Sequence, residues 1–133
     1  MNEAIDTMLA ARTFAVVGAS NHPEKYGNII YHDLKRHGKT VWPVNPGSAT
    51  IDGDPCYPNV AALPEKPEVV VAVIPPAATE KLVDEVAAAG IRHLWIQPGA
   101  ESPAVLEKAL RAGLHVVGGG PCILVGLRTH SVT

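Results

Sequence analysis

Short and almost uninterrupted runs of apolar residues recur along the chain. Four of them are Thr13–Gly18, Thr40–Val44, Val69–Ile74 and His93–Ile96. Runs of this length without polar alternation are typical of strands buried on both faces, as the strands of a parallel sheet are. A fifth and shorter run, His115–Val117, stands directly before a run of glycines and is expected to be the last strand.

Segments of helical character separate these runs, and each is followed by a glycine where a left-handed C-cap belongs. In the second segment Leu82, Val83 and Val86 recur at helical spacing, which leaves the charged residues for the opposite, solvated face. In the third, Ser102 is a good N-cap and Pro103 suits the first helical position, where its missing N–H costs nothing. The segments are 27–37, 77–89 and 102–112.

Two further stretches complete the pattern. Residues 2–11 carry apolar side chains on one side and predict a short N-terminal helix that covers the core at the edge of the domain. Residues 47–67 are rich in glycine and proline, which leaves room only for a short strand near 55–57 and a helical turn near 59–63. We place this piece at an edge of the sheet.

Strand followed by helix, repeated along the chain, is the pattern of βαβ units with right-handed crossovers. It predicts the α/β class, as a Rossmann-like, doubly wound parallel sheet in a three-layer α/β/α arrangement. The chain has 133 residues, the usual size of one domain with a real core. We therefore treat residues 1–133 as a single domain.

Composition narrows the classes of partner. The formal net charge is −2 and the aromatic fraction is 5%, so neither a basic footprint nor a stacking platform for nucleic acid is expected. The sequence has no run that would span a membrane and no signal peptide. Its two cysteines, Cys56 and Cys122, make neither a disulfide framework nor a zinc pattern. These features predict a cytoplasmic protein without a metal site.

The loop after the first strand has the composition of a phosphate-binding turn. It is rich in small and turn-forming residues from Gly18 onward, and it leads into a helix. Backbone N–H groups and the positive end of a helix dipole hold phosphates at such positions. Here Ser20 would add a hydroxyl and Lys25 a charge. An ordinary strand-to-helix turn remains the alternative.

A nicotinamide dinucleotide would need more than this loop provides. The Gly-x-Gly-x-x-Gly spacing is missing, because the loop has only Gly18 and Gly27. The second strand ends in Asn45 and Pro46 rather than in the acidic residue that holds the ribose hydroxyls. NAD is therefore the weaker expectation.

Several motifs in this order resemble the CoA-binding domain family, which includes the N-terminal domain of the succinyl-CoA synthetase alpha subunit and small stand-alone proteins. The resemblance covers nearly the whole chain. The motifs are Val17–Ser20, Val44–Gly47, Val73–Pro76, Gln97–Ala100 and Gly120–Cys122.

The resemblance implies a six-stranded sheet and a coenzyme A molecule lying across the strand ends. It also implies a set of binding residues, to which Lys25 and its neighbour Tyr26 are added from the loop sequence. The set is Gly18, Ala19 and Ser20 at the phosphates, Asn45 and Pro46 beside the nucleotide, Val73, Ile74 and Pro75 along the crevice, and Lys25 and Tyr26 at the start of the helix. One departure concerns charge, because Ser48 stands where synthetase subunits usually carry a lysine. Lys25, Lys39 and Arg12 are the replacements nearest in sequence, and Lys25 is the one we expect.

No catalytic residue is expected. The phosphohistidine of the synthetases resides on a second domain for which this chain is too short, and no acid–base set stands out. The first hypothesis is therefore a non-catalytic module that binds CoA or an acyl-CoA as a carrier, sensor or regulator. The alternatives are an NAD(P)-binding oxidoreductase-like protein, a fragment of an acyl-CoA synthetase that needs a partner chain, and an interaction protein with an empty site.

Overall fold

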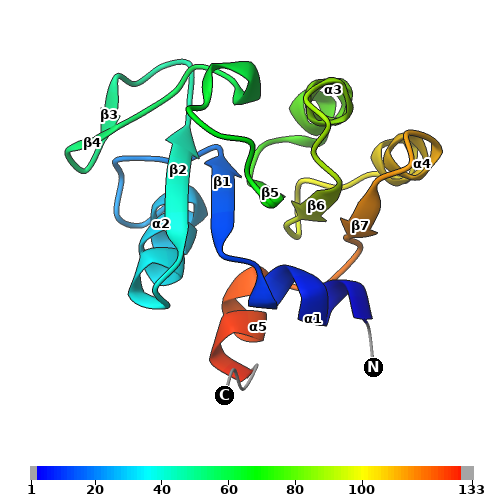
Figure 1. Ribbon diagram of the computed structural model, residues 1–133, viewed down its shortest axis with the longest axis horizontal. Coiled ribbons are helices and arrows are strands. Elements are labelled where there is room, and N and C mark those ends of the chain that lie inside the picture. The colour runs from blue at the N-terminus through cyan, green and yellow to red at the C-terminus, as the bar shows by residue number, and fades with distance from the viewer. Residues whose placement is uncertain (1–2, 130–133) are drawn as a thin grey trace.

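The central element of the fold is a parallel sheet whose strands alternate with helices along the chain (Figure 1). The computed structural model describes residues 3–129. The sheet has five strands in the order β2-β1-β5-β6-β7, and every neighbouring pair is parallel. The strands are β1 (Thr13–Val17), β2 (Thr40–Val44), β5 (Val69–Ala72), β6 (His93–Ile96) and β7 (His115–Val117). The predicted runs and the α/β class are confirmed.

A sixth strand of this sheet, which the family resemblance implied, does not form within residues 3–129. Tyr57 makes only an isolated parallel bridge to Val44 of the edge strand β2. Just before it, β3 (Thr50–Ile51) and β4 (Asp54–Pro55) pair antiparallel as a separate hairpin. Prolines lie two residues before Tyr57 and one residue after it, and a proline has no N–H to donate to a ladder. The predicted turn is present as the 3₁₀ helix η1 (Val60–Ala62).

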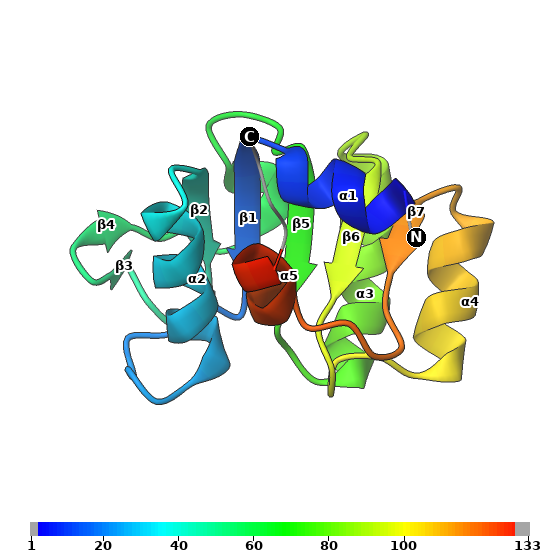
Figure 2. The same ribbon diagram turned by 90° about the horizontal axis from the view of Figure 1, so that it is seen from below.

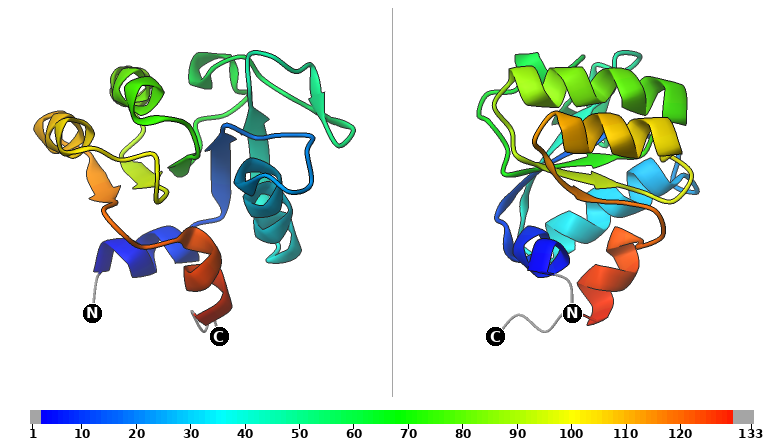
Figure 3. Two further views of the ribbon diagram at one scale, coloured as in Figure 1. Left: turned by 180° about the vertical axis from the view of Figure 1, so that it is seen from behind. Right: turned by 90° about the vertical axis from the view of Figure 1, so that its right-hand side faces the viewer.

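Helices cover both faces of the sheet, and Figure 3 shows the resulting three layers. The buried side chains accordingly form two clusters, one on each side of the sheet. The N-terminal helix contacts β7 and α5, so it covers the core beside an edge strand, as predicted. One face carries α1 (Glu3–Ala10), α2 (Tyr26–Arg36) and α5 (Ile123–Thr129), and the other carries α3 (Pro76–Ala88) and α4 (Pro103–Arg111).

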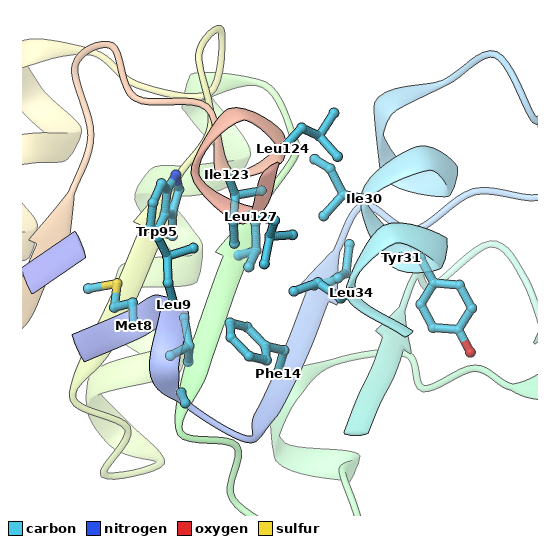
Figure 4. Close-up of a cluster of buried hydrophobic side chains, with 14 of the residues drawn as sticks. Met8, Leu9, Phe14, Ile30, Tyr31, Leu34, Trp95, Ile123, Leu124 and Leu127 are labelled. Carbon is cyan, nitrogen blue, oxygen red and sulfur yellow. The ribbon is translucent and has the colours of Figure 1, made fainter. Parts of the chain in front are cut away.

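The C-terminal helix α5 was not predicted from the sequence. It has only seven residues, of which Ile123, Leu124 and Leu127 are buried. They pack between the α1 side and the α2 side of the same core cluster (Figure 4). A side chain at Gly126 would place its Cβ 3.1 Å from Leu9 of α1, so the glycine lets the two helices approach closely.

Two histidines meet at the amino ends of β6 and β7. The rings of His93 and His115 lie 4.9 Å apart, and the buried Nδ1 of His93 has no hydrogen-bond partner within residues 3–129. Burial, with the nearby charges of His115 and Arg92 and only partial compensation from Glu68, lowers the pKa of His93 below its ordinary value of 6.5.

Because the pKa of His93 is lowered on folding, the unfolded chain binds this proton more readily than the folded chain does. The free energy of unfolding should therefore fall as the pH drops below about 6.5. Urea unfolding of the wild type and of His93→Gln between pH 5 and pH 8 measures this, and the variant should lose part of the dependence. Identical pH profiles would assign the dependence to other groups.

Candidate ligand site

The carboxyl ends of the strands form one edge of the molecule, and Figure 2 shows the arrowheads of β5 and β6 pointing to it. At that edge the chain leaves β1 for α2 on one face, whereas it leaves the neighbouring strand β5 for α3 on the other. Connections that diverge in this way open a crevice at the switch point of a doubly wound sheet. The structure therefore has its crevice between β1 and β5.

Gly18 closes the end of β1 against its neighbours. It adopts φ +101°, and an added Cβ would lie 2.3 Å from the carbonyl oxygen of Val73. A Cβ on Gly27, at the start of α2, would in turn lie 2.0 Å from the carbonyl oxygen of Gly18. Three backbone segments pack against one another here, and a side chain at Gly18 or Gly27 would separate them. The two glycines are therefore required for packing within the protein.

The two residues after Gly18 are held by side-chain amides. Ala19 is fully buried and Ser20 is 8% exposed. The carbonyl of Ala19 accepts a 2.8 Å hydrogen bond from Asn45 Nδ2, and that of Ser20 accepts one of 2.8 Å from Asn28 Nδ2. The Ser20 hydroxyl oxygen accepts from the His22 N–H. The loop is therefore preorganised, and consecutive backbone N–H groups beyond a strand are a frequent anion cradle.

The largest gathering of predicted site residues lines a cavity of about 350 Å³ at the ends of β1 and β2. We call it the asparagine cavity, after Asn45 and Asn59. Four predicted residues contribute to it, together with η1 and one face of α3, which the sequence did not point to. Its lining comprises Val17, Gly18, Val44, Asn45, Pro46, Pro58, Asn59, Val60, Ile74, Ala78, Lys81, Leu82 and Glu85.

Two smaller cavities continue along the same edge. The proline cavity, of about 340 Å³, lies between residues 73–76 and residues 97–100 and therefore includes the predicted Val73, Ile74 and Pro75. The cysteine cavity, of about 180 Å³, is lined by Tyr26, Val73, Gln97, Pro98 and Cys122. Ile74 is shared by the first two cavities and Val73 by the last two, so the three adjoin in a row.

Gln97 lines the cysteine cavity and was not among the predicted binding residues. It is 4% exposed, its Oε1 accepts a 2.7 Å bond from the Ile123 N–H, and its Nε2 donates to the Cys122 sulfur at 3.3 Å. The other thiol, Cys56, lies outside the row of cavities, and burial raises its pKa. Cys56 is therefore protonated at neutral pH.

The predicted charges are spread over both ends of the sheet. Lys25 is exposed at the N-cap of α2 and lines none of the three cavities. Lys39 lies at the amino end, where its Nζ donates to the carbonyls of Leu9 and Ala11 at 2.7 Å each. Arg12 also precedes β1. Lys39 and Arg12 are therefore too far along the strands to serve this edge, whereas Lys81 of α3 lies in it.

The β3–β4 hairpin carries two acidic residues that bind side chains of α2 beside the site. Asp52, in the β3–β4 turn, contacts Asn28 and His32 of α2, and these hydrogen bonds lower the pKa of its carboxyl group. Lys35 and Tyr31 do the same for Asp54. The hairpin is thus fixed to α2, and the chain leaves it toward η1, which forms part of the asparagine cavity.

Within residues 3–129 no three His, Cys, Asp or Glu side chains gather as metal ligands would. No helix in that part of the chain is long and apolar enough to cross a membrane.

Comparison with known proteins gives a consistent picture. The profile of a family described as CoA binding domain matches residues 12–128. Acetate–CoA ligase (ADP-forming) I of Archaeoglobus fulgidus is 32% identical over 86% of this chain and 18% of its own length. The alpha subunit of acetate–CoA ligase (ADP-forming) II of Pyrococcus furiosus is 25% identical over 96% of this chain and 30% of its own length. The chain therefore spans less than a third of these relatives.

Solved structures include proteins of similar size. A conserved hypothetical protein from Pyrococcus furiosus superposes with a TM-score of 0.81 at 44% identity, over 86% of this chain and 97% of its own.

Proposed function

This chain belongs to the CoA-binding domain family, and we propose that it binds coenzyme A or an acyl-CoA without transforming it, as a carrier, sensor or regulator. The observation that carries the proposal is the row of three adjoining cavities along the carboxyl edge of the sheet. CoA is a long molecule with a nucleotide at one end and a thiol at the other, and a row of adjoining cavities suits that shape.

The chemistry of the cavities favours one orientation of the ligand along this edge. The asparagine cavity has apolar walls, from Val44 and Val60, and a side-chain amide at Asn59, which suits an adenine ring. The amide of Ser20 follows at the end of β1 and would hold the diphosphate, with Lys25 adding charge at the start of α2. The pantetheine arm would then run through the proline cavity to the cysteine cavity.

Ligand-dependent unfolding tests the proposal. A ligand at 100 times its Kd adds about 2.7 kcal/mol to the stability of the folded state, which for a domain of this size raises the Tm by roughly 10 °C. CoA and acetyl-CoA should produce such a shift, whereas NAD and NADP should not. A shift with NAD alone would favour the oxidoreductase reading, and no shift with any ligand would favour an interaction protein.

A second candidate is a synthetase component that needs a partner chain. It is favoured by the coverage of the ligase relatives, of which this chain matches only 18% to 30% of the length. Under this proposal the chain would still bind CoA, but acyl-CoA turnover would appear only when further chains are added. Steady CoA binding with no turnover under any such reconstitution would favour the stand-alone module.

A further inference from the structure

The proposed nucleotide site needs a positive charge for the ribose phosphate of CoA. CoA carries a phosphate on its ribose in addition to the diphosphate, and a doubly charged group needs a cation or several N–H donors. Ser48 follows Gly47 at the end of β2, so this strand end carries no cation beside its glycine. The inference below concerns this phosphate and rests on the proposed function.

Most lysine and arginine side chains form interactions away from this site or lie outside it. Ion pairs join Lys35 to Asp54, Arg36 to Asp33, Lys108 to Asp84 and Arg111 to Glu107. Lys39 binds carbonyls at the amino end of the strands. The remaining cations outside the crevice are Arg12 and Arg92, which stand before β1 and β6, and Arg128 in the last turn of α5. Lys66 lines a neighbouring cavity with Leu63 and Ile91, but it does not line the asparagine cavity. Lys25 and Lys81 are left at the carboxyl edge.

Lys81 is the cation that lines the asparagine cavity itself. Ala78, Lys81, Leu82 and Glu85 lie three, four and seven residues apart on α3 and therefore share one helix face, which forms a wall of the cavity. Within residues 3–129 the Lys81 ammonium group makes no ion pair or side-chain hydrogen bond. Glu85 on the same face does not neutralise it through direct contact. Lys81 is thus an unpaired cation beside the site proposed for the nucleotide.

We propose that Lys81 binds the ribose phosphate of CoA and is the residue by which this chain distinguishes CoA from dephospho-CoA. From α3, Lys81 brings to the asparagine cavity the positive charge that the end of β2 does not supply. Lys25 has the separate task of neutralising the diphosphate, which both ligands carry. The two lysines should therefore differ in their effects on the two ligands.

Titration calorimetry with CoA and dephospho-CoA separates these effects. Lys81→Met should weaken CoA binding about tenfold, the size expected for one charge-assisted contact, and should leave dephospho-CoA within about twofold. Lys25→Met should weaken both ligands equally. The matched control Lys66→Met removes the same charge at the neighbouring cavity and should change neither affinity. Lys81→Arg should keep the preference for CoA.

Each outcome bears on one claim. Wild-type protein that binds neither ligand contradicts the proposed function. Wild-type protein that binds both equally, or a Lys81→Met variant that loses both equally or neither, overturns the inference about Lys81 and leaves the proposed function standing. The salt dependence of binding is a second readout. In the wild type, the preference for CoA over dephospho-CoA should decrease as ionic strength rises, because salt screens the charge of Lys81. In Lys81→Met this preference should be small at every ionic strength.

Discussion

Replacing Gly18 by alanine is expected to lower the free energy of unfolding by about 3 kcal/mol or more. The left-handed backbone at φ +101° alone costs a residue with a Cβ about 1 to 2 kcal/mol. The new Cβ would also lie 2.3 Å from the Val73 carbonyl oxygen, which is backbone and can move only if the ends of β1 and β5 separate. Urea unfolding followed by circular dichroism measures the loss.

Gly99 provides a matched control for this substitution. Its φ is +96°, close to that of Gly18, but a Cβ there would meet no atom within 4 Å. Gly99→Ala should therefore show the backbone cost alone, about 1 to 2 kcal/mol. Equal losses in the two variants would show that the contact between strand ends contributes nothing. The comparison also means that Gly18 variants report on folding as well as on ligand binding.

Filling the asparagine cavity is expected to abolish CoA binding while the fold is kept. Ala78 is an exposed residue of α3 that lines this cavity, so a tryptophan there would occupy the space proposed for the nucleotide without entering the core. Ala78→Trp should weaken CoA binding by about 100-fold or more, which corresponds to roughly 3 kcal/mol. Titration calorimetry provides the affinity, and circular dichroism checks the fold.

The neighbouring alanine is the control. Ala77 is also exposed on α3 but lines none of the three cavities. Ala77→Trp should leave CoA affinity within about twofold, as expected of a surface change away from the site. If Ala78→Trp bound CoA as tightly as Ala77→Trp does, the nucleotide would not lie in the asparagine cavity.

The sheet was predictable from the sequence because its strands are buried on both faces. Such strands, for example Val69–Ala72, appear as continuous apolar runs. Helix ends were equally visible, since Ser102 caps α4 through the Val105 N–H. The prediction of secondary structure failed for elements that are too short to show a clear hydrophobic pattern. The seven-residue helix α5 derives its order from packing on α1 and Trp95, and the expected sixth strand was reduced to one bridge at Tyr57.

The candidate site was easiest to predict where its residues directly follow a strand end. The structure brings Gly18, Asn45, Pro46 and Ile74 to one cavity, as consecutive strand ends of a parallel sheet must be close. Lys81 was assigned to the solvated face of its helix, because the sequence shows that a residue is polar but does not show which exposed surface becomes a cavity wall. Gln97 opens one of the motifs quoted from the sequence, but it was not named as a binding residue because its contacts with Cys122 and Ile123 could not be foreseen.

The most direct test of this account is a crystal structure of the protein grown with CoA. The account predicts electron density for the adenine ring in the asparagine cavity, the diphosphate at the amide of Ser20, and the thiol end toward Cys122. Density for CoA in the neighbouring cavity beside Leu63 and Ile91, or in the reverse direction along the crevice, would contradict it.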